Sequence, residues 1–370
     1  MALTKVTSIM IEGAPVNPAG RKNLLINGAM QVAQRGTTAN LANGGSAYKT
    51  VDRFMIEEAG AYTGAFTITQ DTDSPLGFGS SLKWDCTTAD TALAAGDALM
   101  MTYKPEAQDL QLLNYGTSGA LQTTLSFWIK SNKTGTYVVW IYQQDGARQV
   151  QVSYTVDVAD TWEHKTCVIP AHTTVAINND TGAGLYIRWV FGAGTNYTSG
   201  TANTTWAADV TANRHVGQTV NLADSTANYL NITGVQLELG SVATDFEHRS
   251  YGEILADCQR YCHVFQNGST EAHLGVGAQY NSTAVNIALH LPNSLRASPT
   301  AERVLDGSGK WLQIYVGGAS QSSNSVPQVA DFNGNTIRLY CPSSITNRTA
   351  GQASWCHVKA NAKLILSAEL

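Results

Sequence analysis

Aromatic rings are the side chains of this sequence best suited to binding chemistry. A flat ring can stack on the C–H face of a sugar while nearby amides and carboxylates bond its hydroxyls. The polar segment GAGTNYTSGTANTTW carries two such rings, Tyr197 and Trp206, and we expect this loop to be the first place for a ligand. The further candidates stand in strand-like segments: Trp128, Trp140 and Tyr142. For Trp140 and Tyr142 the alternative is a place in the core, because the segment YVVWIY is apolar on both faces.

No catalytic pattern accompanies these rings. The chain has no GxSxG elbow, phosphate-binding P-loop, HExxH zinc motif or Rossmann fingerprint. Glycan cleavage needs two carboxylates held about 5–10 Å apart, one of them with a raised pKa. No motif selects such a pair from the available carboxylates, which include Glu57, Glu58, Asp85, Asp157 and Glu238. We therefore predict a protein that is not an enzyme.

Metal-binding residues are sparse. A jelly roll often holds a structural Ca²⁺ through aspartates and carbonyl oxygens, and Asp71, Asp73 and residues 178–180 could supply them. Asx-rich turns explain these residues equally simply, because Asn and Asp favour tight turns through their own side chains. We predict no cofactor and no dedicated metal site, with a structural Ca²⁺ as the alternative.

The six cysteines are too few for a disulfide scaffold in a chain of 370 residues. Cys258 and Cys262 are four residues apart and precede His263, which permits a metal site, but zinc sites need two properly spaced ligand pairs. Cys341 and Cys356 could pair across a hairpin. The other cysteines lie in strand patterns, where a free thiol acts as a small buried hydrophobe.

Composition excludes several classes of protein. Hydrophobic residues make up 43% of the chain, enough for a packed core, while charged residues make up only 14%. The net charge is −5 and no basic run occurs, so we expect no nucleic-acid partner. The opening MALTKVTSIMIEGAPV lacks an apolar signal region, and no apolar run approaches the roughly 20 residues that span a bilayer, so we expect no membrane insertion.

Alternating apolar residues predict an all-β fold. From residue 23 to residue 249, segments such as SLKWDC and TLSFWIKS alternate with period two, and turn signals separate them. This pattern predicts a jelly-roll-type antiparallel β-sandwich. Within YLNITGVQLEL the apolar phase slips, and a β-bulge at Thr233–Gly234 would return both halves to one core face. Residues 1–22 have the composition of a linker or arm.

A short helix should separate this sandwich from a second unit. Ser250 and Glu253 match a capping box, and the helix over residues 250–262 would place Ile254, Cys258 and Tyr261 on one face. Residues 263–370 continue with strand patterns such as WLQIYV and AKLILSAEL, which predict a smaller C-terminal β-sandwich domain.

Three segments resemble a known family of proteins. NLLINGAMQVAQRGT with the following TVDRF, then GTSGALQTTLSFWIKSNKTGTYVVWI, and finally GVQLELGSVATDFEHRSYGEILADCQRYC resemble the opening, centre and end of a module in bacteriophage tail-fibre and minor virion structural proteins. In that family the module is a β-sandwich like that of carbohydrate-binding modules. The sequence departs from the family pattern at Ala29, where Asp or Asn is common, and at Ala33, where Trp is common.

The resemblance implies a structural component of a tailed-phage virion, in the tail or fibre, with recognition of a host-surface glycan. It implies docking to other virion proteins through residues 1–22, assembly in the host cytoplasm and release on lysis. We further expect a symmetric homo-oligomer, with a trimer favoured. A capsid-decorating or head-fibre protein is the alternative, and a glycan-binding protein outside the virion is a more distant one.

Overall fold

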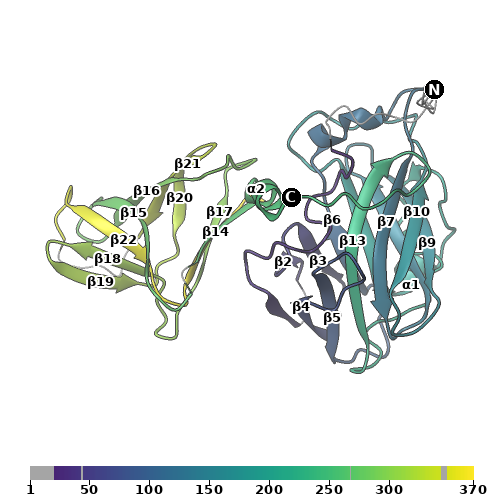
Figure 1. The fold of residues 1–370 in the computed structure, drawn as a ribbon, viewed down its shortest axis with the longest axis horizontal. Coiled ribbons are helices and arrows are strands. Elements are labelled where there is room, and N and C mark those ends of the chain that lie inside the picture. Colours follow the sequence, from purple (N-terminus) through teal and green to yellow (C-terminus); the bar gives the residue numbers. More distant parts are fainter. Residues whose placement is uncertain (1–20, 43–44, 267, 343–347) are drawn as a thin grey trace, which may run out of the picture.

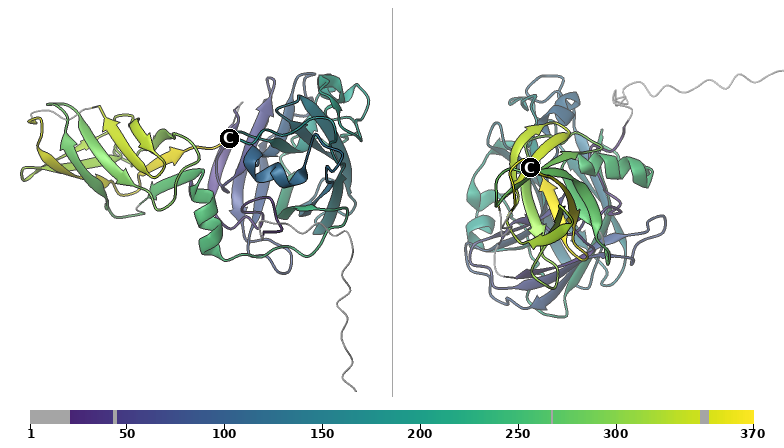
Figure 2. Two further views of the ribbon diagram at one scale, coloured as in Figure 1. Left: turned by 90° about the horizontal axis from the view of Figure 1, so that it is seen from above. Right: turned by 90° about the vertical axis from the view of Figure 1, so that its left-hand side faces the viewer.

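The structure is a computed structural model that describes residues 21–42, 45–266, 268–342 and 348–370. Two β units lie end to end along its long axis, with the helix α2 and the C-terminal residues between them (Figures 1 and 2). The predicted all-β class, with a second and smaller β unit, is confirmed. Residues 1–20, which make up most of the predicted N-terminal arm, lie outside the described residues.

The larger unit is a sandwich of two antiparallel sheets. One sheet has six strands in the order β1 (Thr38–Ala42), β4 (Ala65–Asp71), β5 (Ser81–Thr88), β13 (Tyr229–Leu239), β7 (Thr123–Ser131) and β10 (Glu163–Ile169). The other has seven, in the order β12 (Ala207–Ala208), β9 (Arg148–Val156), β8 (Gly135–Gln143), β11 (Leu185–Ala193), β6 (Ala98–Tyr103), β3 (Phe54–Ala59) and β2 (Ala47–Tyr48). Short helical turns interrupt the loops: η1 (Ala107–Leu113), α1 (Thr195–Thr198) and η2 (Thr211–Asn213).

Period-two alternation places the large side chains between these sheets. Trp84, Phe127 and Trp189 are fully buried there, and each residue lies on the strand face that alternation assigns to the core. Burying an apolar side chain of this size stabilises the fold by about 1.5–3 kcal/mol. Strand β8 is apolar on both faces, as predicted, because Val138 and Trp140 lie under a second, outer cluster.

The bulge predicted in β13 is confirmed. The pairing of β13 with β7 shifts register between Thr233 and Gln236, and Ile232 and Val235 are both fully buried as a result. Gly234 occupies the shift with φ +62°, a left-handed conformation that favours glycine. A Cβ there would lie 2.8 Å from Phe78 and 3.0 Å from Trp128, so the outer face also excludes a side chain.

Helix α2 (Tyr251–Gln259) starts at the predicted capping box. The Ser250 side chain accepts from the backbone of Glu253, and the Glu253 side chain accepts from the backbone of Ser250. The helix ends three residues before the predicted Cys262, which opens the next strand instead. No helix among the described residues is long and apolar enough to span a membrane.

The smaller unit has its own hydrophobic core between two sheets. One sheet contains β14 (Cys262–Gln266), β23 (Lys363–Ser367) and β17 (Thr300–Val304). The other has seven strands in the order β19 (Ala319–Ser323), β18 (Leu312–Val316), β22 (Ala353–Val358), β15 (Ala272–Gln279), β16 (Val285–His290), β21 (Thr336–Cys341) and β20 (Gln328–Asn333). The division of the chain into 1–22, 23–249, 250–262 and 263–370 remains a proposal.

Cys341 and Cys356, which the sequence allowed to pair across a hairpin, do not form a disulfide in the structure. Cys341 lies in β21 and Cys356 in β22, and the strands β15 and β16 separate these two. All six cysteines are free and buried. Burial raises the pKa of the Cys167 thiol to about 12 and that of Cys356 to about 12, so both stay protonated.

One buried and one half-buried ion pair hold the two units together. Arg53, which has no exposed side-chain surface, pairs with Glu369, and its guanidinium lies 3.4 Å from the centre of the Tyr261 ring. Arg260 grips Glu106 through two hydrogen bonds of 2.7 and 2.9 Å. We call this region the junction; an apolar cluster that includes Ile26, Val32, Ile254, Cys258 and Tyr261 completes it.

Candidate functional site

The outer face of the seven-stranded sandwich sheet gathers aromatic and charged side chains from three strands. Trp140 on β8 lies opposite Arg188 on β11, and Tyr142 lies opposite Tyr186 in the neighbouring row. Glu57 reaches Arg188 from β3 across β6. We call these five residues the aromatic face.

Arg188 holds the aromatic face in one arrangement. Its guanidinium lies 4.5 Å from the Trp140 ring centre and 4.6 Å from that of Tyr186, distances typical of cation–π contact. Glu57 accepts two hydrogen bonds from the same guanidinium, at 2.8 and 3.0 Å. Thr102 donates a further one to Glu57, at 2.6 Å. The rings are therefore positioned before any ligand arrives, which lowers the entropy cost of binding.

The helical turn α1 and the residues that follow η2 cover part of this face. His215 is 1% exposed, and its ring lies 5.4 Å from Trp140 and 5.1 Å from Tyr197. Burial lowers its pKa to about 3, with the cations Arg188 and Arg214 adding to the effect, so the imidazole is neutral. Trp140 is only 5% exposed under this cover.

Two rings stay within reach of solvent. Tyr142 and Tyr186 are half-buried, and their ring centres are 5.8 Å apart at an angle of 69°. Lys104 lies 4.9 Å from the Tyr186 ring centre, toward the junction. A sugar ring could stack on either tyrosine, while Lys104 and Arg188 offer hydrogen-bond donors beside it.

The structure separates the two rings of the predicted loop. Tyr197 is half-buried on α1 and packs against the aromatic face. Trp206 is half-buried rather than exposed: its ring stacks on His172 at 4.7 Å and 9°, and its indole N–H donates to the carbonyl of Pro170 at 2.7 Å. Trp206 is therefore anchored to the sandwich and presents no free platform.

Trp128 lies on the opposite side of the sandwich. It is half-buried on the outer face of the six-stranded sheet, with its ring 5.1 Å from that of His164. Three of the five predicted residues thus meet on one face (Trp140, Tyr142 and Tyr197), and the other two do not.

The carboxylates considered for catalysis have structural partners. Burial alone would raise the pKa of Glu57, but the hydrogen bonds and charge of Arg188 outweigh burial, and the pKa lies below its ordinary value. An ionised carboxylate of this kind cannot serve as a general acid. Asp157 pairs with Lys165 at 3.0 Å, and Glu238 accepts from Thr244 at 2.6 and 2.9 Å.

The residues considered for Ca²⁺ stabilise local structure. Asp73 accepts from Lys130 at 2.8 Å and from the Trp162 indole at 3.1 Å, and Asp71 accepts from the backbone N–H of Asp73. Asn178 donates to Asp145 at 2.7 and 2.9 Å. In the part of the chain that the structure describes, no three His, Cys, Asp or Glu residues are grouped so that they could hold a metal ion.

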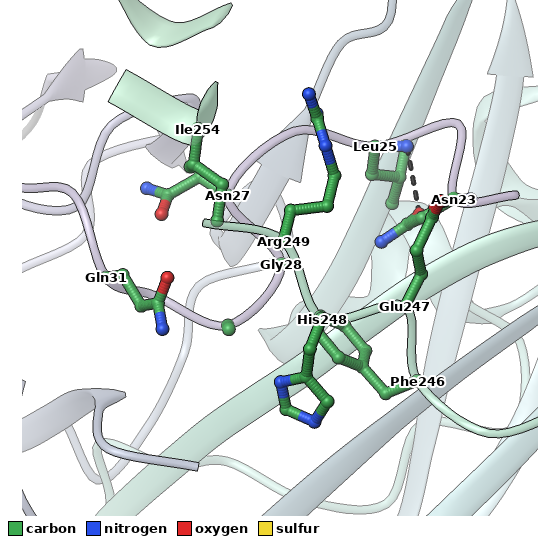
Figure 3. A pocket seen from close by; sticks show the side chains of 11 residues that line it. Asn23, Leu25, Asn27, Gly28, Gln31, Phe246, Glu247, His248, Arg249 and Ile254 are labelled. Carbon is green, nitrogen blue, oxygen red and sulfur yellow. Dashed lines mark hydrogen bonds between the residues drawn. The ribbon is translucent and has the colours of Figure 1, made fainter. Parts of the chain in front are cut away.

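A small cavity lies where the N-terminal segment, the loop before α2 and the first turn of α2 meet. Figure 3 shows Asn27 and Gln31 on one side of it and Phe246 and Glu247 on the other, with Asn23 beside Glu247. Its volume is about 20 Å³, which holds about one water molecule and no sugar ring. Glu247 accepts from the backbone N–H of Asn23 at 2.6 Å, so the loop before α2 is tied to the N-terminal segment.

Sequence reasoning missed Tyr186 and Arg188, and it considered Glu57 only as a carboxylate for glycan cleavage. The alternation that buries Leu185, Ile187 and Trp189 also points Tyr186 and Arg188 to the outer face, so this signal was present in the strand. The contribution of Glu57 depends on the order of the strands β11, β6 and β3, which the sequence does not contain.

Comparisons with known proteins find likenesses only among solved structures. No family model matches the chain, and no curated protein matches it. The enzymatically active domain of tailspike protein 4 of bacteriophage CBA120 matches at 14% identity and a TM-score of 0.30, over 59% of this chain and 21% of the tailspike chain. The family 11 carbohydrate-binding module of the cellulase Lic26A-Cel5E of Clostridium thermocellum matches at 9% identity and a TM-score of 0.26, over 60% of this chain and 96% of the module.

A tandem pair of modules matches over more of the chain. The N-terminal CBM22-1–CBM22-2 tandem domain of Paenibacillus barcinonensis Xyn10C covers 94% of this chain and 98% of its own, at 8% identity and a TM-score of 0.28. At such TM-scores the likenesses carry no argument about function. The case for the aromatic face as a binding site therefore depends on its geometry alone.

Proposed function

We propose that this chain is a structural component of a tailed-phage virion, in the tail or fibre apparatus, and that its aromatic face binds a glycan of the host surface. The observation that carries the binding role is the pair of half-exposed rings, Tyr142 and Tyr186, held beside the Glu57–Arg188 ion pair. The virion assignment is supported by the sequence resemblance to tail-fibre and minor virion proteins. The function is binding without cleavage.

The chemistry of the face suits a saccharide. Tyr142 and Tyr186 each offer a flat apolar surface. Arg188 and Lys104 lie over the Tyr186 ring, and both carry N–H groups that can donate hydrogen bonds to sugar hydroxyls. Sugars present alternating C–H faces and hydroxyls, so they can use both kinds of contact at once.

Two substitutions test the binding role. We expect Tyr142→Ala and Tyr186→Ala each to weaken binding to purified host polysaccharide by about tenfold, as for loss of a central aromatic contact. Tyr251→Ala is the matched control, because Tyr251 is 56% exposed on α2 and lies off the face. Phage particles that carry the variants report adsorption and assembly separately. Unchanged adsorption of both face variants, with normal assembly, would remove the aromatic face as the binding site.

The place in the virion needs a separate experiment. We propose that residues 1–22 dock the chain onto other virion proteins and that the chain forms a symmetric homo-oligomer, with a trimer favoured. An electron-cryomicroscopy map of the assembled particle tests both. Density in the tail supports the proposal, density on the capsid favours a decoration or head-fibre role, and absence from the particle favours a glycan-binding protein outside the virion.

A further inference from the structure

The C-terminal unit carries a second group of aromatic rings, on the outer face of its seven-stranded sheet. Tyr315 on β18, Trp355 on β22 and Val276 on β15 are register partners in one row across three adjacent strands. Their exposed fractions are 39%, 64% and 56%. Trp355 is the most exposed aromatic side chain of the described residues. We call these three residues the distal row, because their strands lie away from the junction (Figure 1).

Polar groups stand beside the distal row. Tyr315 donates a hydrogen bond from its hydroxyl to Glu271 at 2.9 Å, which fixes the direction of the ring. The His357 ring lies 5.1 Å from the Tyr315 ring and 5.4 Å from that of His273. A carboxylate and two imidazoles therefore border the aromatic rings, and all three groups can bond hydroxyls.

Hollows extend the distal row on both sides. One, of about 360 Å³, is lined by Tyr315, Trp355 and the glycine turn of residues 317–318. The other, of about 510 Å³, is lined mainly by apolar surface next to Val276 and ends at the Arg338–Asp331 ion pair on β21 and β20. Strand β20 is the fifth strand along the sheet from β18. At a spacing of about 4.8 Å between neighbouring strands, the row and its two hollows form a track about 24 Å long.

The size and polarity of this track favour a saccharide over a second copy of the chain. A stable protein interface buries about 800 Å² on each partner and uses about 20–30 residues a side. The distal row supplies three large apolar side chains, and ionic or imidazole groups stand close to them. A protein contact would have to dehydrate those groups, whereas sugar hydroxyls can bond them.

We propose that the distal row is a second saccharide-binding site, in which Trp355 and Tyr315 stack on sugar rings while Glu271 and His357 bond hydroxyls. It shares no residue with the aromatic face, so it goes beyond the function proposed above. A linear oligosaccharide would lie across the strands, from the glycine turn toward Arg338.

Isothermal titration of the full chain with soluble hexasaccharides tests this site. The probes are one hexasaccharide each of β-1,4-glucan, α-1,4-glucan, β-1,4-galactan and β-1,4-linked N-acetylglucosamine. We expect at least one to bind, Trp355→Ala to weaken that binding by about tenfold, and Tyr315→Phe to weaken it a few-fold through loss of the Glu271 hydrogen bond. Tyr251→Ala should leave binding unchanged.

Three results would overturn the site: no binding of any probe at millimolar concentration, equal binding by Trp355→Ala, or conversion of an oligomer to monomers by Trp355→Ala in sedimentation equilibrium. The last would make the row an interface between copies. Binding that survives Trp355→Ala but disappears in Tyr186→Ala belongs to the aromatic face alone, so the two sites can fail separately.

Discussion

Replacement of Glu369 by glutamine should destabilise the protein by about 3 kcal/mol, the low end of the cost of breaking a buried ion pair. Glu369 is the carboxylate partner of Arg53 at the junction, and the two side chains are 5% and 0% exposed. Glutamine keeps the shape and one acceptor oxygen but removes the negative charge. The guanidinium of Arg53 then stays buried with one backbone acceptor, the carbonyl of Lys104 at 2.6 Å, and the ring of Tyr261.

Neighbouring charges explain why the expected loss of stability is at the low end of the cost of breaking a buried ion pair. Glu369 also pairs with Arg35 at 3.3 Å, so its loss leaves two cations near one carboxylate, Asp52. Burial raises the pKa of Asp52, and the charge of Glu369 raises it further. Loss of Glu369 lets Asp52 ionise more readily and offset part of the excess positive charge.

Thermal unfolding of the full chain, followed by circular dichroism, measures the effect. A loss of about 3 kcal/mol lowers the Tm by about 6–12 °C for a domain of about 150–250 residues. Asp331→Asn is the control, because the Asp331–Arg338 pair is exposed and should leave the Tm nearly unchanged. The double variant Arg53→Met/Glu369→Leu should recover most of the stability, since an apolar pair can replace a buried ion pair.

The unpaired Arg53 could also reach water if the two units separated, and small-angle scattering can detect such a separation. If the two units separate, Arg53 becomes hydrated, and the radius of gyration rises while the Tm of the sandwich falls less. An unchanged Tm together with an unchanged radius of gyration would refute the reasoning, because a buried guanidinium would then need no counter-charge.

Two further predictions concern the sandwich. Burial raises the folded-state pKa of Asp52 to about 7 from an ordinary value of 3.8. Between about pH 4 and 7 the carboxyl is therefore protonated in the folded chain and ionised in the unfolded chain. The contribution of Asp52 to stability falls as the pH rises across that window. Urea unfolding of Asp52→Asn should therefore show its stability relative to the parent rising from pH 4 to pH 7; a constant difference would contradict the raised pKa. Gly234→Ala should cost about 1–3 kcal/mol, because the bulge needs φ +62° and a Cβ would meet Phe78 and Trp128. Urea midpoints equal to those of the parent would show that the bulge can relax.

Local patterns predicted much of the fold. Three local patterns each predicted a local structure that is observed. They are the alternation around Trp84 and Phe127, the phase slip at Gly234 and the capping box at Ser250. The end of α2 was misplaced because Cys262 continues the helical spacing of apolar residues but pairs with Ser367 in a strand.

The candidate site was predictable only in part. Period-two alternation placed Trp140 and Tyr142 on one face of their strand. Whether other residues cover that face depended on His215, which comes more than 70 residues later in the chain. Trp206 was expected to be exposed because its loop is polar. The indole N–H of Trp206 instead donates a hydrogen bond to the carbonyl of Pro170. No local sequence pattern predicts this contact, because the two segments are distant in the chain. Strand order decides such contacts, and it follows from the packing of the whole chain.

The pairing of β14 with β23 has a mechanical consequence. β14 opens the C-terminal unit and β23 is its last strand; they are antiparallel neighbours, with Cys262 beside Ser367 at the junction end. A pull on the far end of this unit is therefore carried to the sandwich along two adjacent strands, β14 through the chain itself and β23 through the hydrogen bonds of the residues at its end. Residues 367–370 make these hydrogen bonds to Arg35, Arg53 and Tyr48 of the sandwich. The unit should behave as a stiff lever, so that force applied near Trp355 turns the sandwich with it.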